Sequence, residues 1–443
     1  MAAVPLFTHS SPGAPFAWRG GRAVSAHEFL RDVHGLAQRL PCAAHVLNAC
    51  SDRYRFAVAL AACLVDGRTT LLPSTRTPDV IRHVSGFAPD TICVTDDPDC
   101  DIDLPQILQR DEERTAAPWA VPSIDADRQA AIVFTSGSTG TPVPHRKTWG
   151  RLCACVRDGA RRLGLADGRV HALVGTVPPQ HMYGFESTVL LAMQGAHTLV
   201  AEQPFYPGDI VVALESVPRP RVLISTPVHL RALLAADAGR PALDLIISAT
   251  APLAGELSRR LERCFSSPLI EIYGSTETGQ IATRRTARTK RFSLWPGITL
   301  TRIDEGTLVE GGHLEAPTAL CDIVEIVGDG EFLLQGRTED LVNIAGKRSS
   351  LKYLNHQLNS LPGVIDGVFF HGEAASHPET GVARLAAAVV APSLDRATLL
   401  DLLRERIDPV FLPRPLLFVE RLPRNSTGKL PREALRALAA DAE

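Results

Sequence analysis

The sequence predicts an α/β fold in which a large, multi-layer N-terminal domain with parallel sheets precedes a small α+β domain. Three observations support this prediction. The chain has 443 residues, which is more than one hydrophobic core usually supports. Between residues 130 and 274, short apolar runs alternate with helical patterns, as in a parallel sheet covered by helices. After about residue 336 the pattern changes to a short mixed unit. We therefore place the two domains at 1–336 and 337–443.

The spacing of apolar residues predicts the elements in chain order. In the first part we expect helices over Ala26–Leu40 and Tyr54–Asp66, with a strand at His45–Asn48 between them. Further strands are expected at Ala130–Phe134, His171–Val177, Arg221–Thr226, Leu243–Ser248 and Leu269–Tyr273, and further helices at Trp149–Leu163 and Glu256–Phe265. In the second domain we expect strands at Val364–Phe370, Leu385–Val390 and Leu416–Val419, a helix at Arg396–Ile407 and a last helix from Arg432.

Composition excludes several classes of function. A formal net charge of -3 gives no reason to expect nucleic acid or an anionic membrane as a partner. The nine cysteines have no metal-binding spacing, and an odd number of them cannot all pair within the chain. Free thiols favour a reducing compartment, and we find neither a leader pattern nor a membrane-spanning run. We therefore expect a cytoplasmic protein.

The segment TSGSTG directly follows the strand expected at Ala130–Phe134. Its glycines let the backbone turn its amides inward, and its hydroxyl groups donate hydrogen bonds, so the segment is suited to hold phosphate. The same residue types also make ordinary turns, so the segment alone leaves both readings open. The candidate phosphate-binding residues are Thr135, Ser136, Gly137, Ser138, Thr139 and Gly140.

Four further motifs follow in order along the chain. They are PPQHMYG from Pro178, YGSTETG from Tyr273, GRTEDLVNIAGKR from Gly336 and PRNSTGK from Pro423. With these five motifs the chain resembles the adenylate-forming superfamily of acyl- and aryl-CoA synthetases, peptide-synthetase adenylation domains and luciferases. The resemblance covers nearly the whole chain. It implies that a carboxylic acid reacts with ATP, assisted by Mg²⁺, to form an acyl- or aryl-AMP and pyrophosphate, and that a thiol then accepts the acyl group.

In YGSTETG, the resemblance assigns Glu277 as the magnesium-binding carboxylate and Thr276 as a hydroxyl directed at phosphate. Tyr273 corresponds to the aromatic residue that packs on adenine, with Gly274 beside it. Mg²⁺ commonly takes one or two carboxylates together with substrate phosphates, which suits Glu277. The alternative reading is a capped helix that begins at Ser275 or Thr276.

Two further segments correspond to the nucleoside site. Asp322 matches the aspartate that binds both ribose hydroxyls, and Arg337 matches the arginine near it. A carboxylate can accept two hydroxyl hydrogen bonds, whereas the alternative reading is a turn residue between strands. The family's usual glycine before this aspartate is Cys321 here. The segment SATAPL matches the strand end that lines the adenine, through Ala249, Thr250 and Ala251.

The small domain supplies the last catalytic residue that the resemblance implies. Lys429, one of only five lysines in the chain, corresponds to the lysine that stabilises charge during adenylation. The small domain is then a mobile lid, which delivers Lys429 and later turns at Glu339 to admit the thiol. His181 resembles the histidine at the mouth of the acid pocket. The alternative reading of Lys429 is an exposed surface lysine, and that of His181 is a core or surface histidine.

The chain departs from the family pattern at one position of the phosphate loop. Pro142 is followed by Val143 where most members have lysine. Lys147 comes four residues later, and we expect it to reach the β- and γ-phosphates in place of that lysine.

The function expected from the resemblance is an ATP-dependent carboxylic acid:thiol ligase. The opening sequence also resembles compact bacterial acyl or aryl acid ligases that act with carrier proteins. We therefore expect an aromatic or unsaturated acid and the phosphopantetheine thiol of an acyl carrier protein, with coenzyme A as the alternative acceptor. A non-catalytic adenylate-binding protein on the same fold is the second alternative.

Overall fold

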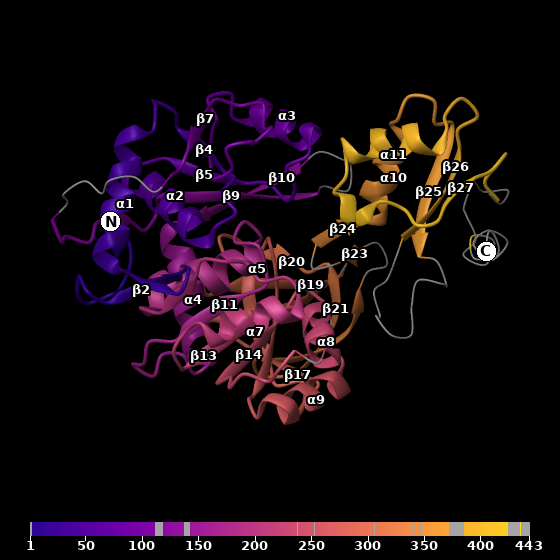
Figure 1. Cartoon of the computed structure of the whole chain (residues 1–443). Helices are drawn as coiled ribbons and strands as arrows, with labels where there is room; N and C mark the ends of the chain where they lie inside the picture. Colours follow the sequence, from indigo (N-terminus) through magenta and orange to yellow (C-terminus); the bar gives the residue numbers. More distant parts are fainter. Residues whose placement is uncertain are drawn as a thin grey trace. The chain divides into compact units, whose positions relative to one another are not determined.

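The chain forms two compact units, each described by itself (Figure 1). The first comprises residues 1–74, 87–134 and 144–338, and the second comprises residues 75–86, 135–143 and 339–443. The computed structural model describes residues 2–110, 118–136, 142–236, 238–251, 253–304, 306–337, 341–344, 347–371, 385–423 and 435. Among these described residues, no helix is both long enough and apolar enough to cross a membrane.

One sheet has six strands, and the four strand pairs β4–β5, β4–β6, β5–β9 and β6–β7 are parallel. Its strands, in spatial order, are β10 (Pro142–Thr148), β9 (Gln129–Ser136), β5 (Thr69–Leu72), β4 (His45–Asn48), β6 (Ile92–Thr95) and β7 (Gln106–Leu108). The strand predicted at His45–Asn48 is confirmed with the same bounds.

A second sheet has eleven strands and carries most of the expected motifs. Its spatial order is β21 (Asp322–Gly328), β22 (Glu331–Arg337), β17 (Arg291–Leu294), β16 (Gly279–Arg284), β15 (Leu269–Ser275), β14 (Leu245–Ser248), β13 (Arg221–Ser225), β11 (Ala172–Gly175), β12 (Thr198–Val200), β2 (Pro15–Arg19) and β3 (Arg22–Ser25). The central pairs, from β2 through β15, are parallel, and the outer pairs are antiparallel. The α/β class predicted from the sequence is therefore confirmed.

Helices cover these sheets, and the remaining strands of the first unit form small antiparallel sheets. The helices are α1 (Ala26–Arg39), α2 (Arg53–Val65), α4 (Trp149–Arg162), α5 (Met182–Gly184), α6 (Leu191–Gly195), α7 (Pro207–Glu215), α8 (Pro227–Ala235) and α9 (Gly255–Phe265), with a π-helical segment η1 (Phe185–Leu190) between α5 and α6. The small sheets are β1 (Ala3–Pro5) with β8 (Ser123–Asp125), and β18 (Ile298–Ile303) with β19 (Gly306–Gly311) and β20 (Thr318–Ala319). The helix α3 (Pro78–Phe87) lies almost wholly in the second unit.

Helix α1 illustrates how the sequence sets an element. Ser25 and Glu28 form a capping box, in which Ser25 Oγ accepts from the Glu28 amide at 3.1 Å and Glu28 accepts from the Ser25 amide at 2.7 Å. The apolar residues then recur every three or four positions and are buried: Phe29, Leu30, Val33 and Leu36.

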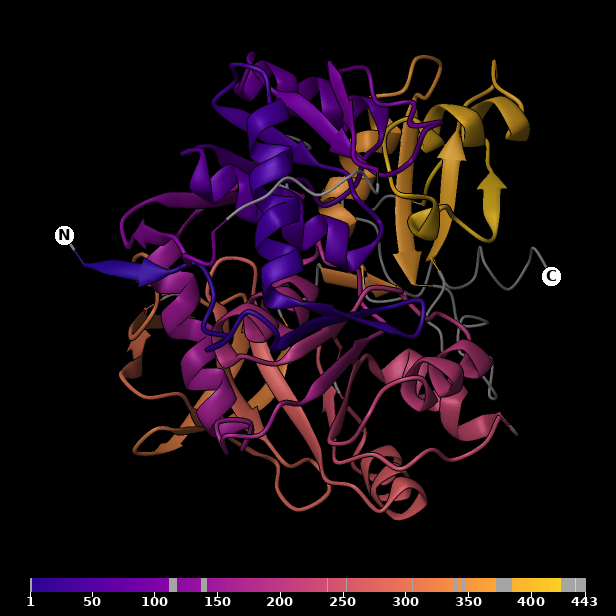
Figure 2. The ribbon, with the colours of Figure 1, turned by 60° about the vertical axis from the view of Figure 1, so that its left-hand side comes forward.

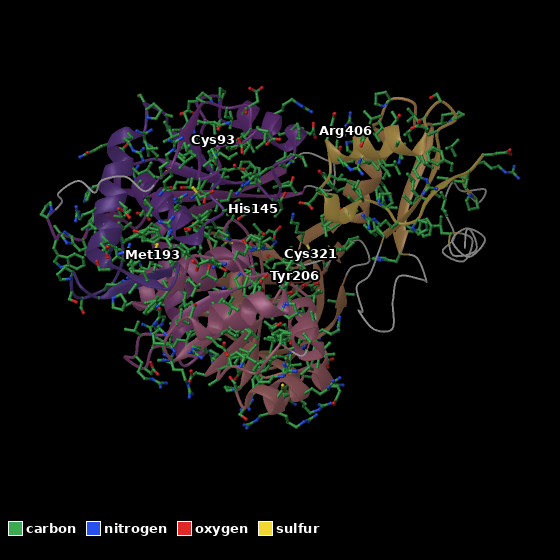
Figure 3. The ribbon with its side chains drawn as sticks, viewed as in Figure 1. Cys93, His145, Met193, Tyr206, Cys321 and Arg406 are labelled. Carbon is green, nitrogen blue, oxygen red and sulfur yellow. The ribbon has the colours of Figure 1, made fainter. Side chains whose placement is uncertain are left out.

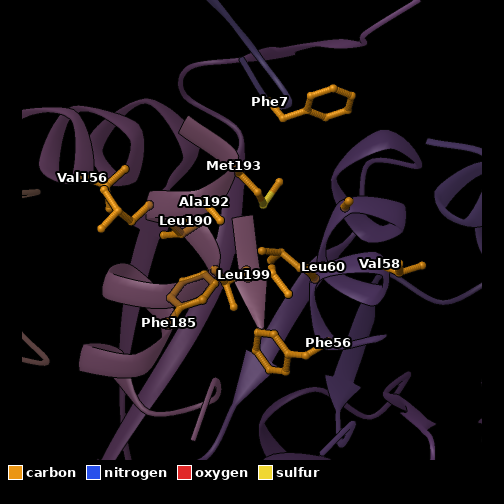
Figure 4. Packing of buried hydrophobic residues seen from close by; sticks show 14 of the residues in the cluster. Phe7, Phe56, Val58, Leu60, Val156, Phe185, Leu190, Ala192, Met193 and Leu199 are labelled. Carbon is orange, nitrogen blue, oxygen red and sulfur yellow. The ribbon is translucent and has the colours of Figure 1, made fainter. Parts of the chain in front are cut away.

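The main core joins residues from both large sheets and their helices. Figure 2 shows the ribbon of these helices and strands from a second side. Figure 4 shows the side-chain packing, in which Phe56 on α2 faces Phe185 at the start of η1, with ring centroids 6.2 Å apart. Because α2 follows a strand of the six-stranded sheet and η1 follows a strand of the eleven-stranded sheet, this contact fixes the first unit as one body.

The second unit has its own core. Its strands and helices are β23 (Leu341–Ile344), β24 (Lys347–Ser350), α10 (Leu351–Asn359), β25 (Asp366–His371), β26 (Leu385–Val390), α11 (Arg396–Arg404), a 3₁₀ turn η3 (Pro409–Phe411) and β27 (Leu416–Phe418). β26 pairs antiparallel with β25 and parallel with β27. The helix expected from Arg432 lies outside the described residues except for Leu435.

Candidate active site

The expected motifs gather at the carboxyl ends of the parallel strands in the eleven-stranded sheet. β13, β14 and β15 are parallel, so their carboxyl ends lie at the same edge of the sheet. Ser225 pairs with Ser248 and Ser248 with Glu271, and β15 runs on beyond this pair to Ser275. Tyr183, from the PPQHMYG motif, reaches this edge and donates to the carbonyls of Ser225 and Ile247, both at 3.2 Å. Open α/β sheets bind ligands at this edge.

The YGSTETG motif forms a tight turn between the antiparallel strands β15 and β16. Gly274 is required, because a Cβ there would lie 2.2 Å from the carbonyl oxygen of Gly279. Ser275 and Thr278 bind each other across the turn, amide to hydroxyl, at 3.1 and 3.2 Å. The alternative reading of a capped helix is therefore wrong: two glycines at the strand ends favour a hairpin over a helix.

Glu277 projects from this turn, and its side chain is 34% exposed. Its Oε1 lies 3.7 Å from His145 Nε2, and burial lowers the pKa of His145 (Figure 3). A single carboxylate with solvent access fits Mg²⁺, which completes its shell with phosphate oxygens and water. The described residues contain no cluster of three or more His, Cys, Asp or Glu side chains that could hold a metal ion.

Tyr273 and Asp322 are brought together as the resemblance implies. Tyr273 Oη donates to Asp322 Oδ2 at 2.9 Å, and the tyrosine ring packs against Phe292 and Phe332 with centroids 5.5 and 5.3 Å away. In the ladder of β21 and β22, Asp322 stands opposite Arg337. The side chain of Arg337 lies outside the description.

The segment expected to line adenine leaves β14 in a strained conformation. Thr250 has a φ of +78°, a region that β-branched residues rarely adopt. The hydroxyls of Ser248 and Thr250 are buried, and neither has a hydrogen-bond partner in the described part of the chain. Buried polar groups without partners are what a bound polar ligand would satisfy, so residues 248–251 fit a nucleoside.

His181 directly precedes helix α5, and its amide donates to the carbonyl of Pro178 at 3.2 Å. Gly184 permits this compact arrangement, because a Cβ there would lie 2.0 Å from the Pro178 carbonyl oxygen. The helix then continues through η1, and π-helical turns are frequent at functional sites.

Lys147, on β10, points into the protein. Its side chain is buried, with the residue only 5% exposed, and Nζ donates to the carbonyl of Glu277 at 2.8 Å. Burial lowers its pKa, and the carboxylates of Glu186, Glu315 and Glu277 partly oppose this effect. The contact that Lys147 makes in this structure is therefore with the Glu277 turn.

Part of the predicted site falls outside the described residues. These are Gly137, Ser138, Thr139, Gly140, Glu339 and Lys429, and the side chain of Ser136. Thr135 is described, at the end of β9.

Sequence reasoning missed several buried polar residues. Arg53 is fully buried and donates to the carbonyls of Val200, Glu202, Gly175 and Val177 at 2.7–3.0 Å. Glu186 is also buried, and burial raises its pKa to about 7. The only sequence signal for Glu186 is an acidic residue within an apolar helical run; Arg53 gives no such signal, because all four of its partners are more than 100 residues away.

Comparison with known proteins decides the family. The model of the family described as AMP-binding enzyme matches residues 10–300. The chain belongs to this family. As an AMP-binding enzyme, it is an AMP-forming acid–thiol ligase of the adenylate-forming superfamily.

The relatives share moderate sequence identity with this AMP-binding enzyme. A 4-chlorobenzoate–CoA ligase from Arthrobacter sp. is 26% identical over 364 residues, which cover 72% of this chain and 68% of the relative. A 4-coumarate–CoA ligase from Rhodobacter capsulatus is 32% identical over 243 residues, which cover 53% of this chain and 58% of the relative.

Solved structures agree with the fold. An o-succinylbenzoate CoA synthetase from Bacillus subtilis superposes with a TM-score of 0.80 at 18% identity, covering 96% of each chain. A malonyl-CoA ligase superposes with a TM-score of 0.77 at 20% identity, covering 95% of this chain and 99% of that one.

Proposed function

We propose that this enzyme is an ATP-dependent ligase that joins an aromatic or unsaturated carboxylic acid to coenzyme A. The observation that carries the proposal is the gathering of the Glu277 turn, the Tyr273–Asp322 pair and the strained Thr250 loop in one unit of an AMP-binding enzyme. The two relatives described above are CoA ligases for aryl acids, so coenzyme A is better supported as the acceptor than the carrier protein expected from the sequence.

In the proposed reaction, a carboxylate oxygen of the acid attacks the α-phosphorus of ATP, and the bond to pyrophosphate breaks. The thiol sulfur then attacks the acyl carbon of the mixed anhydride, AMP leaves with the bonding electrons, and the thiol proton passes to solvent. Both reactants of the first step are anionic, so positive charge and hydrogen-bond donors must offset their repulsion.

We assign the residues as follows. Glu277 would hold Mg²⁺, which when bound supplies positive charge near the phosphate oxygens. Thr276 and residues 135–140 would donate to phosphate, and Lys429 would offset charge at the reacting centre. Tyr273, Asp322, Arg337 and residues 249–251 would bind the nucleoside, and His181 would stand at the acid pocket. The lid role of residues 337–443 stays a prediction.

A screen of carboxylic acids for pyrophosphate release with ATP and Mg²⁺ tests the first step. The best acid is then offered coenzyme A and a phosphopantetheinylated carrier protein in parallel, and thioester is measured by mass spectrometry. Pyrophosphate release without acyl transfer to coenzyme A would contradict the acceptor. No release with any acid would favour the non-catalytic alternative.

Glu277→Gln tests the metal assignment. Loss of a carboxylate that holds the metal should lower kcat for pyrophosphate release by about a hundredfold or more. Glu256→Gln, on the exposed surface of α9, is the matched control and should leave kcat unchanged. Equal rates in the two variants would refute the role of Glu277.

A further inference from the structure

The turn that carries Glu277 rests on buried polar side chains from several parts of the first unit. Lys147 Nζ donates to the carbonyl of Glu277 at 2.8 Å, and His313 Nε2 lies 3.2 Å from the carbonyl oxygen of Thr278. Cys155 Sγ lies 3.8 Å from the carbonyl oxygen of Gln280. The backbone carbonyls of Glu277, Thr278 and Gln280 thus each face a different buried side chain.

Glu186 is a fourth buried side chain that packs against the turn. Its Oε1 accepts from Cys155 Sγ at 3.2 Å. A Cβ placed on Gly279, whose φ is +69°, would lie 2.7 Å from the same oxygen, so the carboxyl packs directly against the turn backbone. We call Lys147, Cys155, Glu186 and His313 the turn support.

The members of the turn support come from distant segments that are themselves linked. Lys147 lies on β10, Cys155 on α4, Glu186 on η1, and His313 in the loop after β19. Glu315, close to His313, accepts from both the amide and the hydroxyl of Thr148, at 2.7 and 2.9 Å. These two hydrogen bonds connect the loop after β19 to the end of β10.

The chemistry of these side chains suits positioning and not bond-making. All four residues are at most 5% exposed. Burial raises the pKa of Cys155 well above its ordinary value, so the group is a thiol and a hydrogen-bond donor. Burial lowers the pKa of His313 to about 4, so the ring is neutral at pH 7 and donates through one nitrogen only.

We propose that the turn support positions Glu277 for its metal, and that Lys147 acts on adenylation through the Glu277 carbonyl and not by binding phosphate. The inference rests on the proposed function. Lys147 is a positioning residue in this view, because its ammonium group donates to the Glu277 carbonyl and the residue is only 5% exposed. Loss of this contact would leave a buried carbonyl without its donor and let the turn shift.

A double-mutant cycle between Lys147→Met and Glu277→Gln distinguishes positioning of the Glu277 turn by Lys147 from binding of phosphate by Lys147. We expect Lys147→Met alone to lower kcat/KM for ATP about 10- to 100-fold, since misplacement by about 1 Å can cost that much. In the Glu277→Gln background the same change should cost less than about threefold, because the group that Lys147 positions is gone. A fall of equal size in both backgrounds, with a raised KM for ATP, would show phosphate binding and overturn the proposal.

Controls guard against unfolding and against failure of the proposed function. Lys290→Met, at an exposed lysine, should leave kcat/KM unchanged. If Lys147→Met does not fold, Lys147→Met with Glu186→Gln removes both buried charges and is used instead. Hydrogen exchange needs no activity: in Lys147→Met the amides of residues 276–280 should exchange about tenfold faster than in the parent. Unchanged exchange would refute the turn support, whether or not the enzyme releases pyrophosphate.

Discussion

Arg53 offers a quantitative test of how the first unit is held together. Its guanidinium group is fully buried at the start of α2 and donates four hydrogen bonds to carbonyls at the ends of β11 and β12. One of these carbonyls belongs to Val177, directly before the PPQHMYG motif. Arg53→Met keeps most of the side-chain volume and removes all four donors.

The expected loss of stability follows from opposing contributions. Hydrogen bonds from a charged group stabilise by about 1.5–3 kcal/mol each, so four give about 6–12 kcal/mol. Against this, burial lowers the pKa of Arg53 from 12.5 to about 10, which at about 1.4 kcal/mol per pKa unit costs about 3 kcal/mol. The net contribution of Arg53 to the free energy of unfolding is therefore about 3–9 kcal/mol. We expect about 4 kcal/mol, near the usual cost of disrupting a buried charged group.

Urea unfolding, monitored by tryptophan fluorescence, measures this loss of unfolding free energy for the first unit alone. All four tryptophans lie in the first unit, so the signal does not depend on the second: Trp18, Trp119, Trp149 and Trp295. Arg161→Met is the matched control, because Arg161 is exposed and pairs only at the surface with Asp158, which is worth less than about 1 kcal/mol. A loss below about 1 kcal/mol in Arg53→Met would refute the argument.

Two further predictions concern pH and the nucleoside site. Burial lowers the pKa values of His9, His197 and His313 to about 4 and raises that of Glu186 to about 7. Three histidines against one carboxyl therefore make the unfolded state bind more protons between pH 4.5 and 6.5. The free energy of unfolding should therefore fall by about 4 kcal/mol from pH 6.5 to 4.5, and a urea midpoint that is equal or higher at pH 4.5 contradicts the sign. Tyr273→Phe removes the hydroxyl that donates to Asp322 at 2.9 Å, so KM for ATP should rise about fivefold, the equivalent of one hydrogen bond, with KM for the acid unchanged. Pyrophosphate-release kinetics measure both constants. An unaltered KM for ATP in Tyr273→Phe would contradict the nucleoside-binding role that we propose for Tyr273 and Asp322.

Elements with clear periodicity were predictable from the sequence. The helix expected at Ala26–Leu40 is α1, and the helix expected at Glu256–Phe265 is α9, each within one residue of its predicted bounds. Their apolar residues recur with helical spacing and pack against a sheet, so local preference and tertiary burial agree. Tyr273 and Asp322, which the family motifs assign to the nucleoside site, are hydrogen-bonded to each other in the structure.

The buried polar contacts were not predictable, because they depend on how distant segments meet. The donor that holds the Glu277 carbonyl comes from Lys147, 130 positions away, and sequence proximity to the phosphate loop suggested a different partner for it. Likewise, the structural alternative that the sequence offered for the segment after Tyr273 was a capped helix. Gly279 at positive φ and its antiparallel partner strand decide for the hairpin, and neither is visible in local propensity.

The ladder of β21 and β22 has a mechanical consequence. Asp322 stands opposite Arg337 on its last rung, and the first unit ends one residue later, at Thr338. The backbone at Arg337, which leads to the second unit, is therefore paired with the backbone of Asp322, the residue proposed to bind ribose. A nucleotide bound at Asp322 would therefore stiffen the strand pair at the point where the chain leaves the first unit.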